Sequence, residues 1–288
     1  MKTIKYYLEK ARKEKFAIGQ FNFSDFSQVK GIVNECAKLK SPVILGTSEG
    51  ESKFVGLEEA VAMRDVLRKK FELPIFLNLD HGKSFEYLKQ AIDAGYDMVH
   101  FDGSKLPLEE NIKITKEVVD YAKLKEVTVE GEVGKMGTDA SRLYDEKFEI
   151  KEEDLTRPEE ALKFIKETKA DLLAISIGSF HGIEISGVCP NLRLEVLKSI
   201  KDKIGDMFLV LHGGSGTPED DIKEAIKLGI IKVNINTELR LAFTGNIRRA
   251  LGDEKELIVP YKYLENAIKS VENLVVTKIE LFGSANKI

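Results

Sequence analysis

The chain has 288 residues, of which 43% are hydrophobic and 32% are charged, and its formal net charge is -4. This is the composition of an ordinary globular protein with enough apolar residues for a large core. The negative charge argues against nucleic acid as the main partner, because a protein that contacts a phosphate backbone is normally basic. No apolar run approaches the roughly 18 residues that a membrane-spanning helix needs. We therefore expect a soluble protein with neither a membrane nor a nucleic-acid partner.

The amino-terminal segment carries charges throughout and contains no hydrophobic signal-peptide region. Its pattern predicts an amphipathic helix. Cys36 and Cys189, the two cysteines, lie far apart in the sequence, and we expect both to be reduced thiols. These features predict a cytoplasmic protein.

Apolar segments of strand length alternate with helical patterns along the chain. The predicted strands lie at residues 16–23, 41–48, 74–80, 97–102, 126–133, 172–177, 208–212 and 230–236. This alternation favours parallel strands joined by helices, and eight such repeats predict a closed (β/α)8 TIM barrel. We expect one barrel domain over residues 1–288, with a helical extension at its carboxyl end. A doubly wound open sheet is the alternative, but the sequence has no GxGxxG motif after its first strand, which excludes the usual dinucleotide-binding variant.

Three of the four histidines share one kind of position. His81, His181 and His212 each lie where a predicted strand ends, and each is followed by glycine. The catalytic groups of a TIM barrel lie at the carboxyl ends of its strands. Three histidines there are typical of a zinc site with a coordination position left for substrate, whereas one alone is typical of a hydrogen-bonded structural residue. His100 lies inside a predicted strand, so we expect it in the core or facing outward.

Acidic side chains also lie at the predicted strand ends. Asp80 precedes His81, where it serves either to orient the histidine or as a general acid. Glu130 and Glu132 are two residues apart and therefore point to the same face of a strand. Burying two carboxylates together is costly unless they share a cation or a proton, which favours a functional role.

Two loops have the composition of a phosphate site. HGGSG at 212–216 follows the seventh predicted strand, and NINT at 234–237 ends the eighth. The loops after these two strands are where TIM barrels commonly hold phosphate. Together with the three histidines, they predict a metal-dependent enzyme that acts on a small phosphorylated molecule.

This series of motifs resembles that of the class II, metal-dependent fructose-bisphosphate aldolases, a family that includes the tagatose-bisphosphate aldolases. The matching segments cover nearly the whole chain in the family's order: QFNF, PVILGTSEG, LDHG, FDGS, VEGEVG, LVLHGGSG, AIKLGIIKVNINTE and LFGSANK. The resemblance implies a zinc-dependent aldolase that reversibly cleaves fructose 1,6-bisphosphate to dihydroxyacetone phosphate and glyceraldehyde 3-phosphate. It also implies a homodimer or homotetramer.

The resemblance implies roles for individual residues. His81, His181 and His212 match the family's zinc ligands, and Glu132 matches a carboxylate that approaches the metal in one of its positions. Asp80 matches the acid that handles the proton on the aldehyde-derived oxygen. The positions that match those holding dihydroxyacetone phosphate, usually with a monovalent cation (Na⁺ or K⁺) nearby, are Gly182, Gly213, Ser215, Asn234, Asn236 and Thr237.

The chain departs from the family pattern in the segment 134–157. The family usually carries a Gly-Gly-x-Glu-Asp loop there, whose glutamate removes a proton from dihydroxyacetone phosphate. This chain has Asp139 in place of that glutamate, which makes Asp139 the nearest candidate base. Asp145 and Glu146 follow further along the same segment.

Other functions stay open. Asn236 replaces an aspartate found in some family members, and the lysine that often follows the second histidine is absent, so tagatose 1,6-bisphosphate remains an alternative substrate. A Schiff-base aldolase needs a lysine that points into the barrel, whereas we expect Lys232 to point outward. A barrel that binds a sugar phosphate without catalysis is a further alternative. Because sites with three histidines accept several divalent ions, cobalt and manganese are alternatives to zinc.

Overall fold

The main strands of the protein close into a barrel. The computed structural model describes residues 2–136, 138, 142–145, 149–185, 189–253 and 256–288. The barrel strands are β1 (Ile18–Asn22), β2 (Val43–Ser48), β3 (Ile75–Gly82), β4 (Met98–Phe101), β5 (Thr128–Val133), β7 (Leu172–Ile175), β9 (Phe208–Leu211) and β10 (Ile230–Ile235). Their order is β1-β10-β9-β7-β5-β4-β3-β2, and every neighbouring pair is parallel. The predicted (β/α)8 TIM barrel is confirmed.

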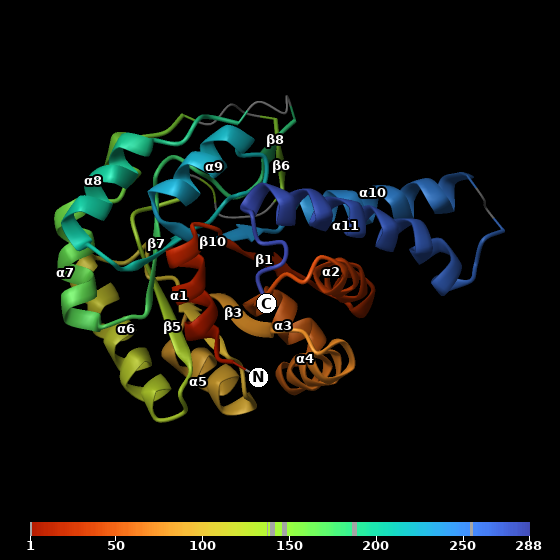
Figure 1. Ribbon diagram of the computed structural model, residues 1–288, viewed down its shortest axis with the longest axis horizontal. Coiled ribbons are helices and arrows are strands. Elements are labelled where there is room, and N and C mark those ends of the chain that lie inside the picture. The colour runs from red at the N-terminus through yellow and green to blue at the C-terminus, as the bar shows by residue number, and fades with distance from the viewer. Residues whose placement is uncertain (1, 137, 139–141, 146–148, 186–188, 254–255) are drawn as a thin grey trace.

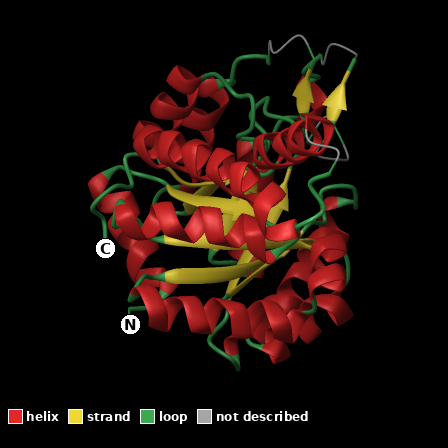
Figure 2. Cartoon of the chain, turned by 90° about the vertical axis from the view of Figure 1, so that its right-hand side faces the viewer, coloured by secondary structure: helices red, strands yellow, loops and turns green. Residues whose placement is uncertain are grey.

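Helices surround the barrel on its outside (Figure 2). They are α1 (Ile4–Glu14), α2 (Phe26–Lys38), α3 (Glu49–Val55), α4 (Leu57–Phe71), α5 (Phe85–Ala94), α6 (Leu108–Lys123), α7 (Pro158–Thr168), α8 (Leu194–Ile204), α9 (Glu219–Leu228), α10 (Thr237–Asp253) and α11 (Pro260–Phe282). The last two pack side by side and extend away from the barrel beside α2 (Figure 1), which confirms the predicted helical extension. No helix in the described part of the chain is both long enough and apolar enough to cross a membrane.

Capping side chains explain where several helices begin. Asp25 Oδ1 accepts hydrogen bonds from the backbone N–H groups of Ser27 at 2.6 Å and Gln28 at 3.1 Å, so Asp25 caps the start of α2. Ser48 and Glu51 form a reciprocal capping box that begins α3. The Ser-x-x-Glu spacing is the sequence signal for the start of this helix.

Two loops at one end of the barrel pair with each other. β6 (Leu143–Tyr144) and β8 (Ile183–Glu184) form a two-stranded parallel sheet. This sheet lies at the opposite end of the molecule from the two chain termini (Figure 2). A short 3-10 helix, η1 (Glu152–Asp154), lies in the same predicted irregular segment, 134–157. The loops after β5 and β7 are therefore held against each other.

The barrel interior changes from apolar to polar along the strands. At the amino ends, α1 covers an apolar cluster, whose members include Leu8, Ile18, Ile44, Phe76, Met98, Leu172 and Val210. Side chains two residues further along a strand point to the same face. On β3, Phe76 is therefore followed inward by Asn78, whose amide donates to Gln20 Oε1 at 2.8 Å. The polar layer lies toward the carboxyl ends of the strands.

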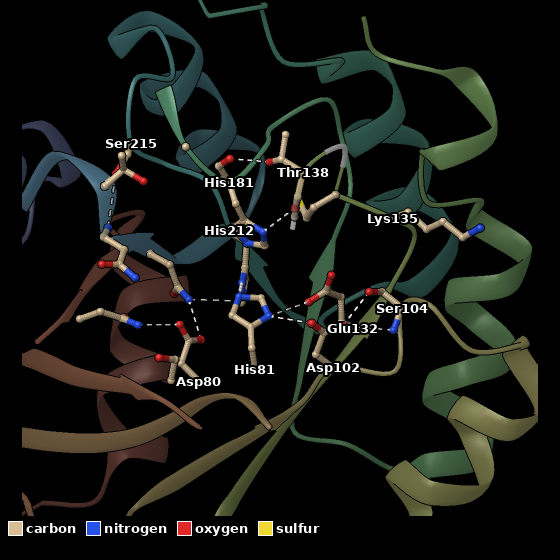
Figure 3. Close-up of a pocket in the computed structure, with 18 of the residues that line it drawn as sticks. Asp80, His81, Asp102, Ser104, Glu132, Lys135, Thr138, His181, His212 and Ser215 are labelled. Atoms are coloured by element: carbon tan, nitrogen blue, oxygen red, sulfur yellow. Dashed lines mark hydrogen bonds and ion pairs between the residues drawn. The ribbon is translucent and has the colours of Figure 1, made fainter. Parts of the chain in front are cut away.

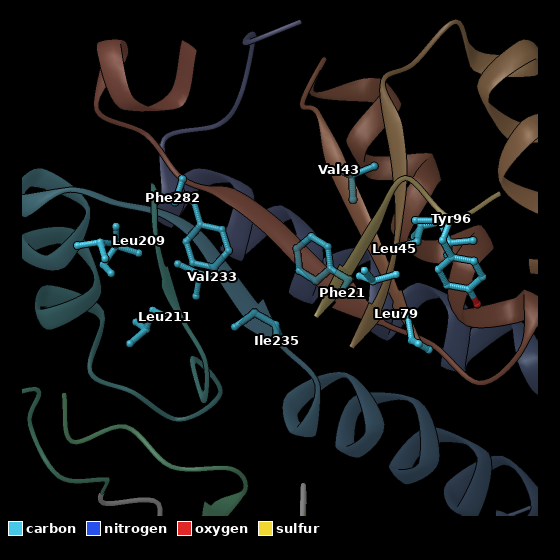
Figure 4. Close-up of a cluster of buried hydrophobic side chains, with 14 of the residues drawn as sticks. Phe21, Val43, Leu45, Leu79, Tyr96, Leu209, Leu211, Val233, Ile235 and Phe282 are labelled. Atoms are coloured by element: carbon cyan, nitrogen blue, oxygen red, sulfur yellow. The ribbon is translucent and has the colours of Figure 1, made fainter. Parts of the chain in front are cut away.

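The outward faces of the strands form the second core. Alternate strand residues such as Leu45, Leu79, Leu211 and Val233 are buried in one apolar cluster with residues of the surrounding helices (Figure 4). Because one strand face packs on helices and the other fills the barrel, both faces of most strands are apolar near the amino end. That end is where polar residues begin.

Candidate functional site

A cavity of about 590 Å³ opens at the carboxyl ends of the barrel strands. Most of the predicted site residues line it, namely Asp80, His81, Glu132, His181, Gly182, His212, Gly213, Ser215, Asn234, Asn236 and Thr237. The predicted candidates Glu130 and Asp145 do not line it. Asp139, the predicted base, lies outside the described residues. Residues from strands far apart in the sequence thus meet at one place.

Each of the three predicted ligand histidines has one ring nitrogen held by an oxygen, and Figure 3 shows the contacts of His81 and His181. The distances are 3.0 Å from His81 Nδ1 to Asp102 Oδ2, 3.3 Å from His181 Nδ1 to the Thr138 carbonyl, and 2.7 Å from His212 Nε2 to Glu130 Oε1. Carboxylate and carbonyl oxygens accept hydrogen bonds, so these nitrogens carry the protons. The other nitrogen of each ring therefore presents a lone pair.

Two of these lone pairs face each other, and the His181 ring lies beside them. His81 Nε2 and His212 Nδ1 are 3.0 Å apart. His181 Nε2 is buried without a hydrogen-bond partner among the described residues, and the His181 and His81 ring centroids are 4.7 Å apart. Facing lone pairs repel unless a proton or a cation lies between them. One anchored N–H and one free lone pair on each ring is the arrangement of metal-ligating histidines, so the donor set fits a divalent ion such as zinc.

Buried carboxylates favour positive charge at the same place. Glu132 Oε2 lies 3.8 Å from His81 Nδ1, and the ligand atoms of His81, Asp102 and Glu132 all lie within 4.8 Å of one another. Burial alone would lower the pKa of His81, but Asp80 and the hydrogen bond to Asp102 outweigh burial and raise that pKa. Burial, with the His81 and His212 rings, lowers the pKa of His181 to about 4, so its ring is neutral at pH 7.

Asp80 is held in place by two amides. Asn22 Nδ2 donates to Asp80 Oδ2 at 2.9 Å, and Asn234 Nδ2 donates to Asp80 Oδ1 at 3.1 Å. Burial alone would raise the pKa of Asp80, but the neighbouring His81 and His100, together with His212 and Lys232, outweigh it and hold the pKa well below its usual range. The sequence analysis did not identify Asn22 as a site residue. The signal was its position, because Asn22 ends β1 and Asp80 and His81 likewise lie near the end of β3.

Lys232 points into the barrel, so the expectation that it points outward is wrong. Its ammonium group donates to Glu130 Oε2 and to Asn234 Oδ1, both at 2.8 Å, and the residue is fully buried. Lys232 and Asn234 are two residues apart on β10, so the strand period places both on the inward face. Lys232 is not among the described residues that line the cavity. A buried, ion-paired ammonium is not available as a Schiff-base nucleophile.

His100 is buried inside the barrel, so of its two expected positions, in the core or facing outward, the first is observed. Its Nδ1 accepts the backbone N–H of His81 at 3.1 Å. This hydrogen bond requires a lone pair on Nδ1, because a protonated Nδ1 would direct its hydrogen at the His81 N–H. The proton of the ring is therefore on Nε2.

The opposite side of the cavity has the geometry of an anion site. Gly213 has φ 65°, and a Cβ there would clash with the backbone of Phe180, so only glycine fits. Ser215 Oγ accepts the N–H groups of Asn236 and Glu238, both at 3.3 Å. Thr237, the first residue of α10, lines the cavity. Helix N-termini and glycine-rich turns favour phosphate.

Comparisons with known proteins agree with this geometry. The family model of class-II fructose-bisphosphate aldolase matches residues 2–287. The chain is 41% identical over 288 residues to 6-phospho-5-dehydro-2-deoxy-D-gluconate aldolase of Bacillus subtilis (strain 168), covering 99% of this chain and 96% of that protein. It is 37% identical over 288 residues to fructose-bisphosphate aldolase of Geobacillus stearothermophilus, covering 99% and 98%. The crystal structure of the YdjI aldolase from Escherichia coli K12 is 31% identical, with TM-score 0.82 and coverage of 100% and 99%.

The fold and these matches define an aldolase, that is, a lyase built on a TIM barrel. The chain belongs to the class II fructose-bisphosphate aldolase family, whose members depend on a metal ion and act on phosphorylated sugars.

Proposed function

We propose that this protein is a zinc-dependent aldolase. It cleaves a phosphorylated ketose, or a phosphorylated keto sugar acid, to dihydroxyacetone phosphate and an aldehyde. The proposal rests on the facing lone pairs of His81 and His212, with the buried Nε2 of His181, which has no hydrogen-bond partner among the described residues, on the adjacent ring. Glu132 is the proposed additional ligand, in one of its positions. A zinc ion held there supplies Lewis-acid chemistry, which polarises the ketone and stabilises the enediolate.

Asp80 is the proposed acid-base residue. The amides of Asn22 and Asn234 hold its carboxylate, and its lowered pKa keeps it ionised. In cleavage it accepts the proton of the hydroxyl that becomes the aldehyde, and in condensation it returns that proton. Asp139 is the proposed residue that removes a proton from dihydroxyacetone phosphate in condensation, by its match to the family's loop.

The glycine-rich side of the cavity is the proposed phosphate site. The residues assigned to it are Gly182, Gly213, Ser215, Asn234, Asn236 and Thr237. The backbone N–H groups of the turn and the positive end of the α10 dipole favour a phosphate dianion there. A monovalent cation, Na⁺ or K⁺, beside the phosphate is part of the proposal.

Fructose 1,6-bisphosphate is the proposed substrate, and tagatose 1,6-bisphosphate is its epimeric alternative. A sugar acid is the second candidate, because four relatives at 39–41% identity are named 6-phospho-5-dehydro-2-deoxy-D-gluconate aldolases. The 6-phosphate and 5-ketone of that acid correspond to the dihydroxyacetone phosphate half of the sugar bisphosphates. The candidates therefore differ in the part released as aldehyde, which carries a phosphate or a carboxylate.

We also propose a homodimer or homotetramer that works in the cytoplasm. Cys36 and Cys189 are both free and buried, as is usual for thiols in a reducing compartment.

A coupled cleavage assay tests the proposed function. The three substrates are compared in parallel, before treatment with EDTA, after it, and after zinc is restored. We expect turnover to be lost on chelation and recovered with zinc, and the ratio of kcat/KM values to identify the substrate. His81→Ala and His181→Ala should each abolish recovery. Activity that survives complete metal removal would contradict the three-histidine site.

A further inference from the structure

His100 is the one histidine that the proposed chemistry does not use. It is fully buried on β4, and its ring centroid is 4.8 Å from those of both His81 and His212. It does not line the cavity as the structure describes it. A buried histidine within contact distance of two proposed metal ligands is expected to affect how those ligands are held.

Each nitrogen of the His100 ring faces a different residue of the candidate site. Nδ1 accepts the backbone N–H of His81 at 3.1 Å, so the proton of the neutral ring is on Nε2. Nε2 lies at ion-pair distance, 3.2 Å, from Glu132 Oε2, and within the described part of the chain neither atom has a hydrogen-bond partner. The carboxylate of Glu132 is therefore the charged group that Nε2 faces. The ring has no lone pair left for a metal ion, so a ligand role does not fit.

The backbone of His81 needs support of the kind that His100 gives. His81 has φ 52°, which is the left-handed region that residues other than glycine rarely adopt. Such a conformation persists when surrounding contacts hold it in place. The hydrogen bond to His100 Nδ1 is a contact of this kind, and it fixes the residue whose Nε2 faces His212 Nδ1 at 3.0 Å.

We propose that His100 is a positioning residue with two separate contacts. Through Nδ1 it holds the left-handed backbone of His81 and so aims the imidazole of that residue. Through Nε2 it holds the carboxylate of Glu132 beside the three histidines. The inference rests on the proposed function, because aiming His81 and Glu132 has a purpose when these residues bind a metal ion.

Three substitutions separate the two contacts. In His100→Asn the amide oxygen replaces Nδ1 as an acceptor, while the side chain is too short to reach Glu132. In His100→Gln the amide nitrogen replaces Nε2 as a donor, and the acceptor for the His81 N–H is lost. His100→Leu fills similar space and keeps neither contact.

Zinc affinity, measured by competition with a chromogenic chelator, reports on the His81 contact without any sugar. Outer contacts to metal-binding histidines typically change metal affinity by 10- to 100-fold. We expect His100→Gln and His100→Leu to bind zinc roughly tenfold more weakly than the unchanged protein, and His100→Asn to stay within about threefold of it. Equal losses in His100→Asn and His100→Leu would show that the ring merely fills space, and would overturn the inference.

The kcat at saturating zinc reports on the Glu132 contact. We expect it to fall in His100→Asn and His100→Leu, with little change in KM, and to be kept in His100→Gln. If all three variants matched the unchanged protein in zinc affinity and in kcat, the proposed role of His100 would be overturned while the proposed function would stand. Failure of the unchanged protein to bind zinc would instead overturn the proposed function, so the two failures are distinguishable.

Discussion

A single buried lysine connects two parts of the candidate site. The ammonium of Lys232 donates to Glu130, which accepts from His212, and to Asn234, which donates to Asp80. A fully buried ammonium is tolerated because the Glu130 carboxylate compensates its charge. The same cation therefore orients a candidate metal ligand and the candidate acid.

Lys232→Met should be strongly destabilising, because it leaves the buried Glu130 carboxylate without its cation. We expect the free energy of unfolding in urea to fall by about 3–5 kcal/mol. In Lys232→Met/Glu130→Gln the uncompensated charge is gone, so much of this loss should be regained. A double-mutant cycle measures the coupling between the two residues. Additive effects of the two single changes would show that the ion pair does not act as described.

At the scale of elements, the turn after β9 depends on a glycine. Gly213 combines a left-handed φ of 65° with close approach to the Phe180 backbone. An L side chain is therefore excluded both by its own backbone conformation and by the neighbouring loop. The turn brings β9, the loop after β7 and the start of α10 together around the proposed phosphate site.

Gly213→Ala should displace this turn. We expect the free energy of unfolding to fall by about 1–3 kcal/mol, and the KM for the phosphorylated substrate to rise more than kcat changes. The matched control is Gly245→Ala within α10, where no described atom beyond its own helical neighbours lies within 4 Å of an added Cβ. Alanine is favoured in a helix, so this control should gain up to about 1 kcal/mol. Equal behaviour of the two variants would contradict the argument.

An element can be predicted from the sequence when the pattern that specifies it lies within its own chain segment. The barrel strands and the helices around them follow from apolar periodicity and caps such as Asp25, which belong to the chain segment itself. The β6 and β8 strands have two residues each and exist because two distant loops meet, so no local pattern marks them. The same contrast applies to the site, where strand ends predict His81, His181 and His212. The contacts of His100 and Lys232 depend on neighbouring strands and register.

At the scale of the whole molecule, the two ends of the barrel have different tasks. The amino end is filled by apolar side chains and covered by α1, in which Leu8 is fully buried. The carboxyl end holds the polar layer and the cavity. In TIM barrels the first end generally serves stability and the second end catalysis. A change at the amino end should therefore alter stability without altering the site.

Leu8→Ala tests this separation. The substitution removes buried methyl groups under α1 and leaves a cavity, so we expect the free energy of unfolding to fall by about 3 kcal/mol. Zinc affinity and kcat should stay unchanged at temperatures where the variant is folded, because the polar layer separates Leu8 from the histidines. Val66→Ala, at a position on α4 that is 65% exposed, is the control, and it should change stability by less than about 0.5 kcal/mol. A weakened zinc affinity in folded Leu8→Ala would mean that packing at the amino end helps to set the metal geometry, and the two ends would then have to be treated as one coupled unit.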